Sequence, residues 1–482
     1  MKLYNSMTKQ LEELKPLDGD TVKMYTCGPT VYDFFHVGNA RCFVIFDFLR
    51  RYLEYRGYKV NFTQNFTDID DKLIKRANAE GTTVKEVAEK YIKEYFTDAE
   101  GLGIKKATHH PRATENIPEI IEMVKKLEEG GYAYAVSPDG KSEDKDVYFR
   151  TRKFKGYGKL SHKNIDDLES GARIDVSDIK EDPLDFAVWK AAKPGEPYWE
   201  SPWGKGRPGW HIECSAMSRK YLGANIDIHA GGEDLAFPHH ENEIAQSESY
   251  NSCCGCTDPT FTRIWLHNAY ILTDGVKMSK SGISFKVRDA AAKYGYETIR
   301  FFIISAHYRS PVNYSEEAMH QAKVSLERLH TCEENLGFRI KAAANDVPRS
   351  LSDEEKNLLC AFEGRRKQMC DALDNDFNTA DGIAAVFELT RDINRALANE
   401  NLSAEFLNKA WEIYTDMLAL FGFEKKESAG NSDDAEIEEL VAKRTDAKKA
   451  KNYAEADRIR DELKARGIVI EDTPNGPKWK RV

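Results

Sequence analysis

The sequence predicts an α/β fold for the first part of the chain and an α-helical bundle after it, and three observations carry this prediction. Short apolar runs alternate with segments of helical spacing over residues 20–120 and again over 210–250. Residues 131–200 instead carry short strand-like pieces and many turn residues, which indicates an insertion. From about residue 315 to 422 the apolar residues have the spacing of a helical bundle. A chain of 482 residues is long enough for three or four such domains.

The individual elements follow from the same patterns. Short apolar runs predict strands at 22–26, 58–66, 146–150, 186–189 and 226–229. Helical spacing predicts helices at 41–56, 84–97, 117–129 and 212–222, and one from about residue 239. Near the C-terminus we expect a helical hairpin and a small β unit, which together form an α+β unit. The predicted domains are 1–130, 131–200, 201–314, 315–423 and 435–482, with a polar linker at 424–434.

Composition narrows the function classes. No apolar run approaches the roughly 18 residues of a membrane helix, and the N-terminus lacks a secretion signal, so we expect a cytoplasmic protein with no membrane partner. Nine cysteines without such a signal favour metal ligands and core thiols over a disulfide framework. A net charge of −10 argues against a general polyanion-binding surface, although a local basic patch can still bind a specific RNA.

A nucleotide site is predicted beside the end of the first strand. A Gly-Pro pair after Cys27 breaks the run 22–26, and His36-Val-Gly-Asn39 stands where a helix begins. Ligands of open α/β sheets bind at such strand ends, and helix N-termini favour phosphate. Gly38 admits a close backbone approach, while the side chains of His36 and Asn39 can donate hydrogen bonds to phosphate oxygens. A histidine at a helix start is also a common cap, so the tetrapeptide alone is a weak signal.

A lysine-bearing loop is predicted to act on the same nucleotide. Lys277-Met-Ser-Lys-Ser281 follows Thr273-Asp-Gly275 and therefore lies in a glycine-flanked loop. The ammonium groups of Lys277 and Lys280 can stabilise charge that develops at the α-phosphate of a triphosphate. The alternative is an ordinary solvated loop, and the presence of the first signature favours the nucleotide role.

Four residues that are far apart in the sequence form a candidate metal site. His239 and Glu243 are four residues apart and share one helical face, and Cys214 stands at another helix start. With Cys27 they offer two thiols, an imidazole and a carboxylate, a donor set that suits zinc. Buried cysteines and a solvated acidic helix would give the same spacing, and His240-Glu241 offers competing ligands.

Two further motifs are interpreted as incidental. Cys253-Cys-Gly-Cys256 lacks the spacing of a common zinc knuckle, so we interpret it as a thiol-rich loop rather than a second metal site. Residues 204–209 match a dinucleotide fingerprint, but the proline-rich segment before them does not read as an apolar strand. We expect a glycine-rich active-site loop there, leading to Trp210.

Six motifs together make the sequence resemble the cysteinyl-tRNA synthetases, a family of class I aminoacyl-tRNA synthetases. They are Cys27-Gly-Pro-Thr30, His36-Val-Gly-Asn39, Thr67-Asp-Ile-Asp-Asp-Lys72, Gly209-Trp-His-Ile-Glu-Cys-Ser215, Phe237-Pro-His-His-Glu-Asn-Glu243 and Lys277-Met-Ser-Lys-Ser281. The resemblance runs from about residue 20 to the C-terminus and includes Asp376-Phe-Asn-Thr379. It implies a Rossmann-like class I catalytic domain. Val37 and Asn39 stand where the general class I signature has isoleucine and histidine.

The resemblance also implies roles for single residues. It implies one zinc ion per chain, which binds the substrate's thiol and is held by Cys27, Cys214, His239 and Glu243. It implies phosphate contacts from His36, Asn39, Lys277 and Lys280, with Lys280 the usual ATP-contacting lysine. Our further candidates for ATP contacts are Gly38, Gly231, Gly232 and Asp234, and those for the amino acid are Trp210 and Thr67.

The implied activity is the ATP-dependent attachment of L-cysteine to tRNA(Cys) through cysteinyl-adenylate, with ATP and Mg²⁺ as substrate and a monomer as the expected state. The helical region and the C-terminal unit would read the tRNA, where Trp479 either stacks on a base or packs within the unit. One alternative is a zinc-dependent cysteine ligase acting on an amino sugar, as in mycothiol synthesis. Another is an inactive RNA-binding zinc protein. The residues after Glu317 argue against the first alternative, and an intact 277–281 motif argues against the second.

Overall fold

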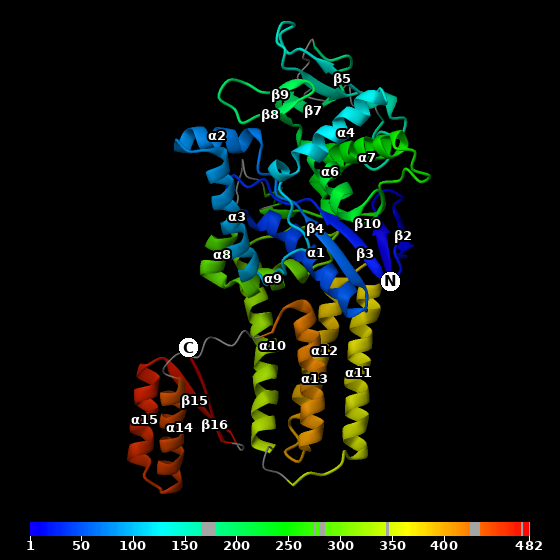
Figure 1. Cartoon of the computed structure of the whole chain (residues 1–482). Coiled ribbons are helices and arrows are strands. Elements are labelled where there is room, and N and C mark those ends of the chain that lie inside the picture. The colour runs from blue at the N-terminus through cyan, green and yellow to red at the C-terminus, as the bar shows by residue number, and fades with distance from the viewer. Residues whose placement is uncertain are drawn as a thin grey trace. The chain divides into compact units, whose positions relative to one another are not determined.

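The computed structural model describes residues 1–164, 179–273, 275–278, 285–343, 347–424, 434–473 and 476–481. The chain divides into two compact units. The first comprises Met1–Glu327, Arg365–Phe387 and Leu420–Gly422, and the second comprises Arg328–Gly364, Glu388–Ala419 and Phe423–Val482. Figure 1 shows the elements of both units along the chain.

A four-stranded parallel sheet forms the centre of the first unit. Its order is β11-β10-β3-β4, with bounds Thr262–Asn268, Ile226–Gly232, Thr21–Thr26 and Lys59–Gln64. All seven residues of β10 are buried, as expected for a parallel strand covered on both faces. The predicted α/β fold is therefore confirmed. Strand β10 extends to Gly232 rather than ending at His229, because its pairing with β11 continues to that residue.

Helix α1 (Val37–Tyr55) connects β3 to β4 and is buried over most of its length. The Nδ1 atom of His36 accepts a hydrogen bond from the backbone N–H of Asn39 at 3.2 Å. This cap starts the helix at Val37, ahead of the predicted Arg41, because a capped first turn does not depend on apolar spacing.

The other helices of the α/β part mostly follow the predictions. They are α2 (Asp71–Glu80), α3 (Val84–Gly101), α4 (Ile117–Glu129), α6 (Trp210–Leu222), α7 (Glu241–Cys253), α8 (Val287–Tyr294) and α9 (Tyr296–Ile304). Helix α7 begins at Glu241 rather than near His239, because the wide turn over Ala236–His240 contains the extended residue Phe237.

A five-stranded antiparallel sheet in the order β5-β6-β7-β9-β8 occupies the predicted insertion 131–200 and extends beyond it to Pro208. Its strands are Ala133–Val136, Asp146–Phe149, Phe186–Ala191, Gly204–Pro208 and Trp199–Ser201. The predicted strands at 146–150 and 186–189 are confirmed. The predicted glycine-rich loop at 204–209 is wrong, since most of it is strand β9. Glycine is needed at position 206 because a Cβ there would lie 2.2 Å from the indole nitrogen of Trp189.

Two small sheets complete the α/β part. Strands β1 (Lys2–Asn5) and β2 (Gln10–Glu13) pair as a hairpin. Strand β12 (Ile271–Thr273) lies between β13 (Val276–Lys277) and β14 (Val312–Asn313), so this second sheet carries the first lysine of the predicted loop.

The rest of the chain is largely helical, as predicted. Its helices are α10 (Glu316–Ala343), α11 (Asp353–Asp374), α12 (Thr379–Ala396), α13 (Ala404–Phe421), α14 (Asp434–Lys449) and α15 (Tyr453–Ala465), and they are followed by the hairpin of β15 (Ile468–Thr473) and β16 (Gly476–Arg481). Trp479 is partly buried against the cluster formed by Ile437, Val441 and Ile459, which favours the packing interpretation of this residue. Among the described residues, no helix combines the length and apolar character needed to cross a membrane.

Candidate active site and metal centre

A cavity of about 330 Å³ lies where β3 and β10 end, the place at which the sequence predicts a ligand site. Its lining includes residues of both nucleotide signatures together with Cys27, Trp210, Gly232 and Asp234, but none of the motif at 237–243. The fold thus brings together segments from both halves of the α/β part. Gly231 and Thr67 are not among the lining residues.

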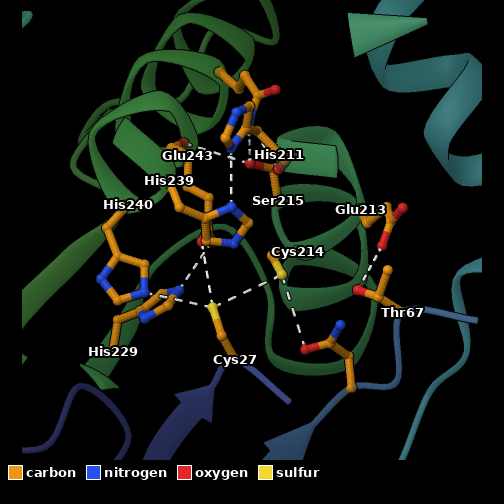
Figure 2. A network of polar contacts seen from close by, with 12 residues as sticks. Cys27, Thr67, His211, Glu213, Cys214, Ser215, His229, His239, His240 and Glu243 are labelled. Atoms are coloured by element: carbon orange, nitrogen blue, oxygen red, sulfur yellow. Dashed lines mark hydrogen bonds and ion pairs between the residues drawn. The ribbon is translucent and has the colours of Figure 1, made fainter. Parts of the chain in front are cut away.

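The four predicted metal ligands meet beside this cavity and are all buried. Cys27 Sγ lies 3.8 Å from Cys214 Sγ and 3.4 Å from Glu243 Oε1, and His239 Nε2 lies 3.1 Å from the same carboxylate oxygen. Figure 2 shows these side chains converging from the end of β3, from α6, from the turn before α7 and from α7 itself. Such spacings suit donors that share one metal ion, and the two thiols with one imidazole match the preferences of zinc.

Neighbouring histidines orient two of these ligands. His229 Nε2 lies 2.9 Å from Glu243 Oε2, which leaves Oε1 of that carboxylate facing Cys27. His211 Nδ1 lies 2.9 Å from His239 Nδ1, which turns the Nε2 atom of His239 toward Glu243. Hydrogen bonds of this kind fix the ring orientation of a metal-binding histidine.

The charges of the cluster are strongly coupled. Burial raises the pKa of Cys27 well above its usual value, whereas a hydrogen bond from Cys27 lowers the pKa of Cys214 to about 6. Burial acts against a charge on His239, but Glu243 and Cys214 outweigh it and raise the pKa of His239 to about 10. Burial likewise opposes ionisation of Glu243, but His229 and His239 hold its pKa well below the usual range. A cation is therefore well accommodated here.

The two competing ligands occupy different positions. Glu241 accepts hydrogen bonds from the backbone N–H groups of Gly158 and Ser161, so its carboxylate anchors the insertion. His240 Nε2 lies 3.4 Å from Cys27 Sγ, and a second possible donor set comprises Cys27, His229, His240 and Glu243. This second set has one thiol instead of two and is the poorer match for zinc.

The first nucleotide signature forms the start of α1. Because His36 caps the helix with its own ring, a Cβ on Gly38 would lie 2.8 Å from His36 Nδ1. Glycine at this position allows the ring to fold over the first turn, and the side chains of both His36 and Asn39 reach the cavity.

The lysine loop also contributes to the lining of the cavity through Lys277 and Met278. Lys277 Nζ lies 3.3 Å from Asp234 Oδ2 and 3.9 Å from the centre of the Tyr270 ring. Met278 is buried. Residues 279–284, including Lys280, lie outside the described residues.

The proposed substrate residues are placed differently from one another. The partly exposed Trp210 lines the cavity, and its ring centre lies 4.3 Å from that of His239. The hydroxyl of Thr67 instead donates a hydrogen bond to Glu213 at 2.9 Å (Figure 2). Its partner is therefore another side chain of the protein, and Thr67 does not line the cavity.

Sequence reasoning missed three residues of the site. His211 and His229 orient metal ligands, and the Oδ1 atom of Asn65 accepts the backbone N–H of Gly28 and lies 3.8 Å from Cys214 Sγ. The available signals were a histidine in a strand expected to be buried and a second one three residues before Cys214. The thiol-rich loop at 253–256 contributes to neither possible donor set among the described residues.

Comparisons with known families agree with this geometry. The family described as the catalytic domain of class I (C) tRNA synthetases matches residues 13–324. A DALR domain matches 368–425, and a cysteinyl-tRNA ligase anticodon binding domain matches 433–479.

Full-length relatives and solved structures extend the comparison. Cysteine–tRNA ligases of Clostridioides difficile and Caldicellulosiruptor saccharolyticus are each 53% identical to this chain, over 100% of both partners. The Mycobacterium tuberculosis methionyl-tRNA synthetase bound to methionyl-adenylate shares the fold, with a TM-score of 0.58 at 15% identity over 84% of this chain and 90% of that one. The chain belongs to the cysteinyl-tRNA synthetase family of class I aminoacyl-tRNA synthetases.

Proposed function

We propose that this chain attaches L-cysteine to tRNA(Cys) in two ATP-dependent steps. The observation that carries the proposal is the buried set of two thiols, an imidazole and a carboxylate beside the cavity. The same cavity is lined by residues of both nucleotide signatures. A metal-binding pocket for a sulfur and a binding site for a triphosphate are the two parts that activation of cysteine requires.

The proposed metal is one zinc ion per chain, held by Cys27, Cys214, His239 and Glu243. The donor set fits zinc because it combines soft and borderline ligands in a buried place. When bound, zinc supplies coordination of the substrate sulfur as a thiolate, whereas the hydroxyl of serine stays protonated and is a harder, weaker ligand. An apolar pocket would separate two such similar side chains poorly. Selection by sulfur chemistry therefore makes a separate editing domain unnecessary.

In the first step, the carboxylate of cysteine attacks the α-phosphate of ATP, giving cysteinyl-adenylate and pyrophosphate. His36 and Asn39 donate hydrogen bonds to phosphate oxygens from the start of α1, where the helix also favours negative charge. Lys277 and Lys280 stabilise the charge that develops during the transfer. No covalent intermediate with the protein is needed.

The proposed contacts to adenosine and to cysteine follow from where these residues lie in the fold. Gly38 lets the phosphates approach the helix start, and Gly231, Gly232 and Asp234 contact the adenosine at the end of β10. Because Asp234 now holds Lys277, a ribose hydroxyl on Asp234 would release that lysine toward the phosphates. For the amino acid, the ring of Trp210 covers the bound cysteine. Thr67 acts indirectly, since its hydrogen bond holds Glu213 in place beside the pocket.

In the second step, the terminal ribose hydroxyl of the tRNA takes the cysteinyl group from the adenylate. We assign recognition of the tRNA to the helical region 315–423 and to the C-terminal unit 435–482, in line with the DALR and anticodon-binding matches. We further propose that the protein works as a cytoplasmic monomer. The amino-sugar ligase alternative has no use for an anticodon-binding unit.

One combined assay tests the function. Purified protein should contain one zinc ion per chain, catalyse cysteine-dependent ATP–pyrophosphate exchange, and form cysteinyl-tRNA but no adduct with glucosaminyl-inositol. Exchange without any cysteinyl-tRNA product would favour the amino-sugar ligase. Bound zinc without exchange would favour an inactive RNA-binding protein.

A further inference from the structure

Arg41 is a fully buried cation on the first turns of α1, two residues beyond the histidine–asparagine signature. Its Nη1 donates to the carbonyl oxygen of Tyr270 at 2.8 Å. Its Nη2 donates to the carbonyl oxygens of His307, Tyr308 and Ser310. Among the described residues no carboxylate pairs with this guanidinium, so four backbone carbonyls are what hold it.

These carbonyls belong to the segments that carry the lysine loop. The same Tyr270 oxygen accepts the backbone N–H of Val312 at 3.1 Å, which begins the pairing of β12 with β14. The Tyr308 oxygen also accepts the N–H of Ala269 at 2.9 Å. On its other edge β12 pairs with β13, where Leu272 lies opposite Lys277. Arg41 therefore joins α1 to the small sheet from which Lys277 projects.

The link continues through the side chain of Tyr270. Its ring lies beneath the ammonium group of Lys277, and the residue lines the cavity. Met278 reaches back toward the start of α1, since its carbonyl oxygen lies 3.9 Å from the position of a Cβ on Gly38. The two nucleotide signatures are thus adjacent, and Arg41 fixes the backbone at their junction.

Arginine is suited to this place in a way that other residues are not. Its planar fork can address several carbonyls at once, whereas lysine is a point charge with a different donor geometry. A buried charge without an anionic partner also lowers stability relative to an apolar side chain of similar volume. Burial lowers the pKa of Arg41 to about 10, which still leaves it charged at neutral pH. A long apolar residue would fill the same space, so packing alone does not require an arginine at position 41.

We propose that Arg41 is a positioning residue for adenylyl transfer, which sets the distance between the start of α1 and Lys277. This inference rests on the proposed phosphate role of Lys277. It assigns Arg41 no contact with the substrate and makes its effect depend on the lysine.

The test compares Arg41→Lys and Arg41→Met with a matched control, Arg50→Lys. Arg50 lies on the same helix, where it hydrogen-bonds Glu54 and the carbonyl of Lys106 and lies over the Phe62 ring, and it does not line the cavity. Arg41→Met removes the buried charge and should fold even where Arg41→Lys does not. The rate of cysteine-dependent pyrophosphate exchange, the KM for cysteine, and the amount of cysteinyl-adenylate formed per chain are measured.

We expect both Arg41 variants to lower the exchange kcat about 10- to 100-fold, with a full adenylate titre and an unchanged KM for cysteine. In a Lys277→Ala background the same changes should add less than about 3-fold, because the two residues act as one unit. The Arg50 variant should match the wild type.

Three results would overturn the inference. The first is a wild-type exchange rate in Arg41→Met. The second is a smaller amount of adenylate per chain with a normal exchange rate for each chain that remains active. The third is an equal loss of exchange rate from the Arg41 substitution in the wild-type and Lys277→Ala backgrounds. Failure of the premise is distinct from these, since a Lys277 without a phosphate role would appear as unchanged exchange in Lys277→Ala alone, and failure of the proposed function would appear as no exchange in the wild type.

Discussion

Two ion pairs, one from each unit, show contrasting ways in which charged side chains pair. In the first, Arg300 Nη2 lies 3.1 Å from Asp47 Oδ2, with both side chains only 1% exposed and 253 residues apart in sequence. In the second, Lys443 and Glu439 pair at 2.7 Å along one helix, with 59% and 66% of their side chains exposed. Buried pairs are costly to break, whereas exposed ones contribute little. The first unit therefore holds its chemistry in place by long-range polar contacts, and substitutions there should have the larger effects.

The largest effect is expected at the metal cluster. Cys214→Ala should lose stoichiometric zinc and lower cysteine-dependent exchange by about 1,000-fold or more, because a ligand and the sulfur pocket are lost together. Zinc content and exchange are measured on the same preparation. Cys332→Ala, which removes a buried thiol of α10, should keep both. A Cys214 variant with one tightly bound zinc ion would refute the ligand assignment.

The second effect concerns the lysine loop. Lys280→Ala should slow exchange by about 100-fold while cysteine binding stays near normal, because an interaction made only in the transition state lowers kcat. Lys293, an exposed lysine of α8 that pairs with Glu316, offers the control Lys293→Ala. Unchanged exchange would remove Lys280 from the phosphate site.

A moderate effect on stability is expected at Asp376. Its carboxylate accepts hydrogen bonds from the backbone of Tyr4, the hydroxyl of Tyr308 and the guanidinium of Arg309, so it joins two other segments of the first unit to its own. Asn at this position tolerates the left-handed backbone (φ 59°), so Asp376→Asn isolates the loss of the negative charge and of one acceptor oxygen. We expect about 2 kcal/mol less stability and a lower Tm by calorimetry.

The matched control for Asp376 is Asp371→Asn, which removes an exposed partner of Lys367. Its Tm should stay close to that of the wild type. If the two variants had equal Tm values, the contrast between buried and exposed acceptors would not hold in this region.

The last prediction concerns the pH dependence of stability at Glu355. This carboxylate belongs to the second unit but is buried and hydrogen-bonded, like Asp376 of the first unit. Glu355 is buried and accepts from Arg349, Ser352 and Ser403. Burial opposes its charge, but these donors outweigh it and lower its pKa to about 2. A depressed folded pKa gives stability that is complete above the ordinary value of 4.5 and is lost as the pH falls toward 2.

The Tm of Glu355→Gln should therefore lie below that of the wild type at neutral pH, and the gap should narrow below pH 4.5. Lys443→Ala, at an exposed pair, should change stability by less than about 0.5 kcal/mol at any pH. A gap for Glu355→Gln that widened on acidification would contradict the assigned direction.

The fold was predictable where its causes are local. Helices α3, α4 and α6 and strands β3 and β4 follow from apolar spacing, and so does the helical second half. Strand β9 was missed because the glycine at position 206 is required by the close approach of Trp189, a contact that apolar spacing does not show. The early start of α1 was missed because it depends on the ring of His36.

The candidate site, like the fold, could be predicted only in part from the sequence. The four residues of the candidate metal site and both proposed nucleotide signatures can be named from motifs. The roles of His211, His229 and Asn65 cannot, because they depend on contacts between strands and helices that only the fold brings together. Arg41 belongs to the same group, since its partners lie more than two hundred residues away.

The most direct test of the metal centre is X-ray absorption at the zinc edge, with and without cysteine. Zinc held by Cys27, Cys214, His239 and Glu243 should show two sulfur neighbours at about 2.3 Å, and a third should appear when cysteine binds. A single protein sulfur would indicate the alternative set with His229 and His240 instead. A sulfur count that did not change on adding cysteine would contradict the claim that this centre selects the substrate through its thiol.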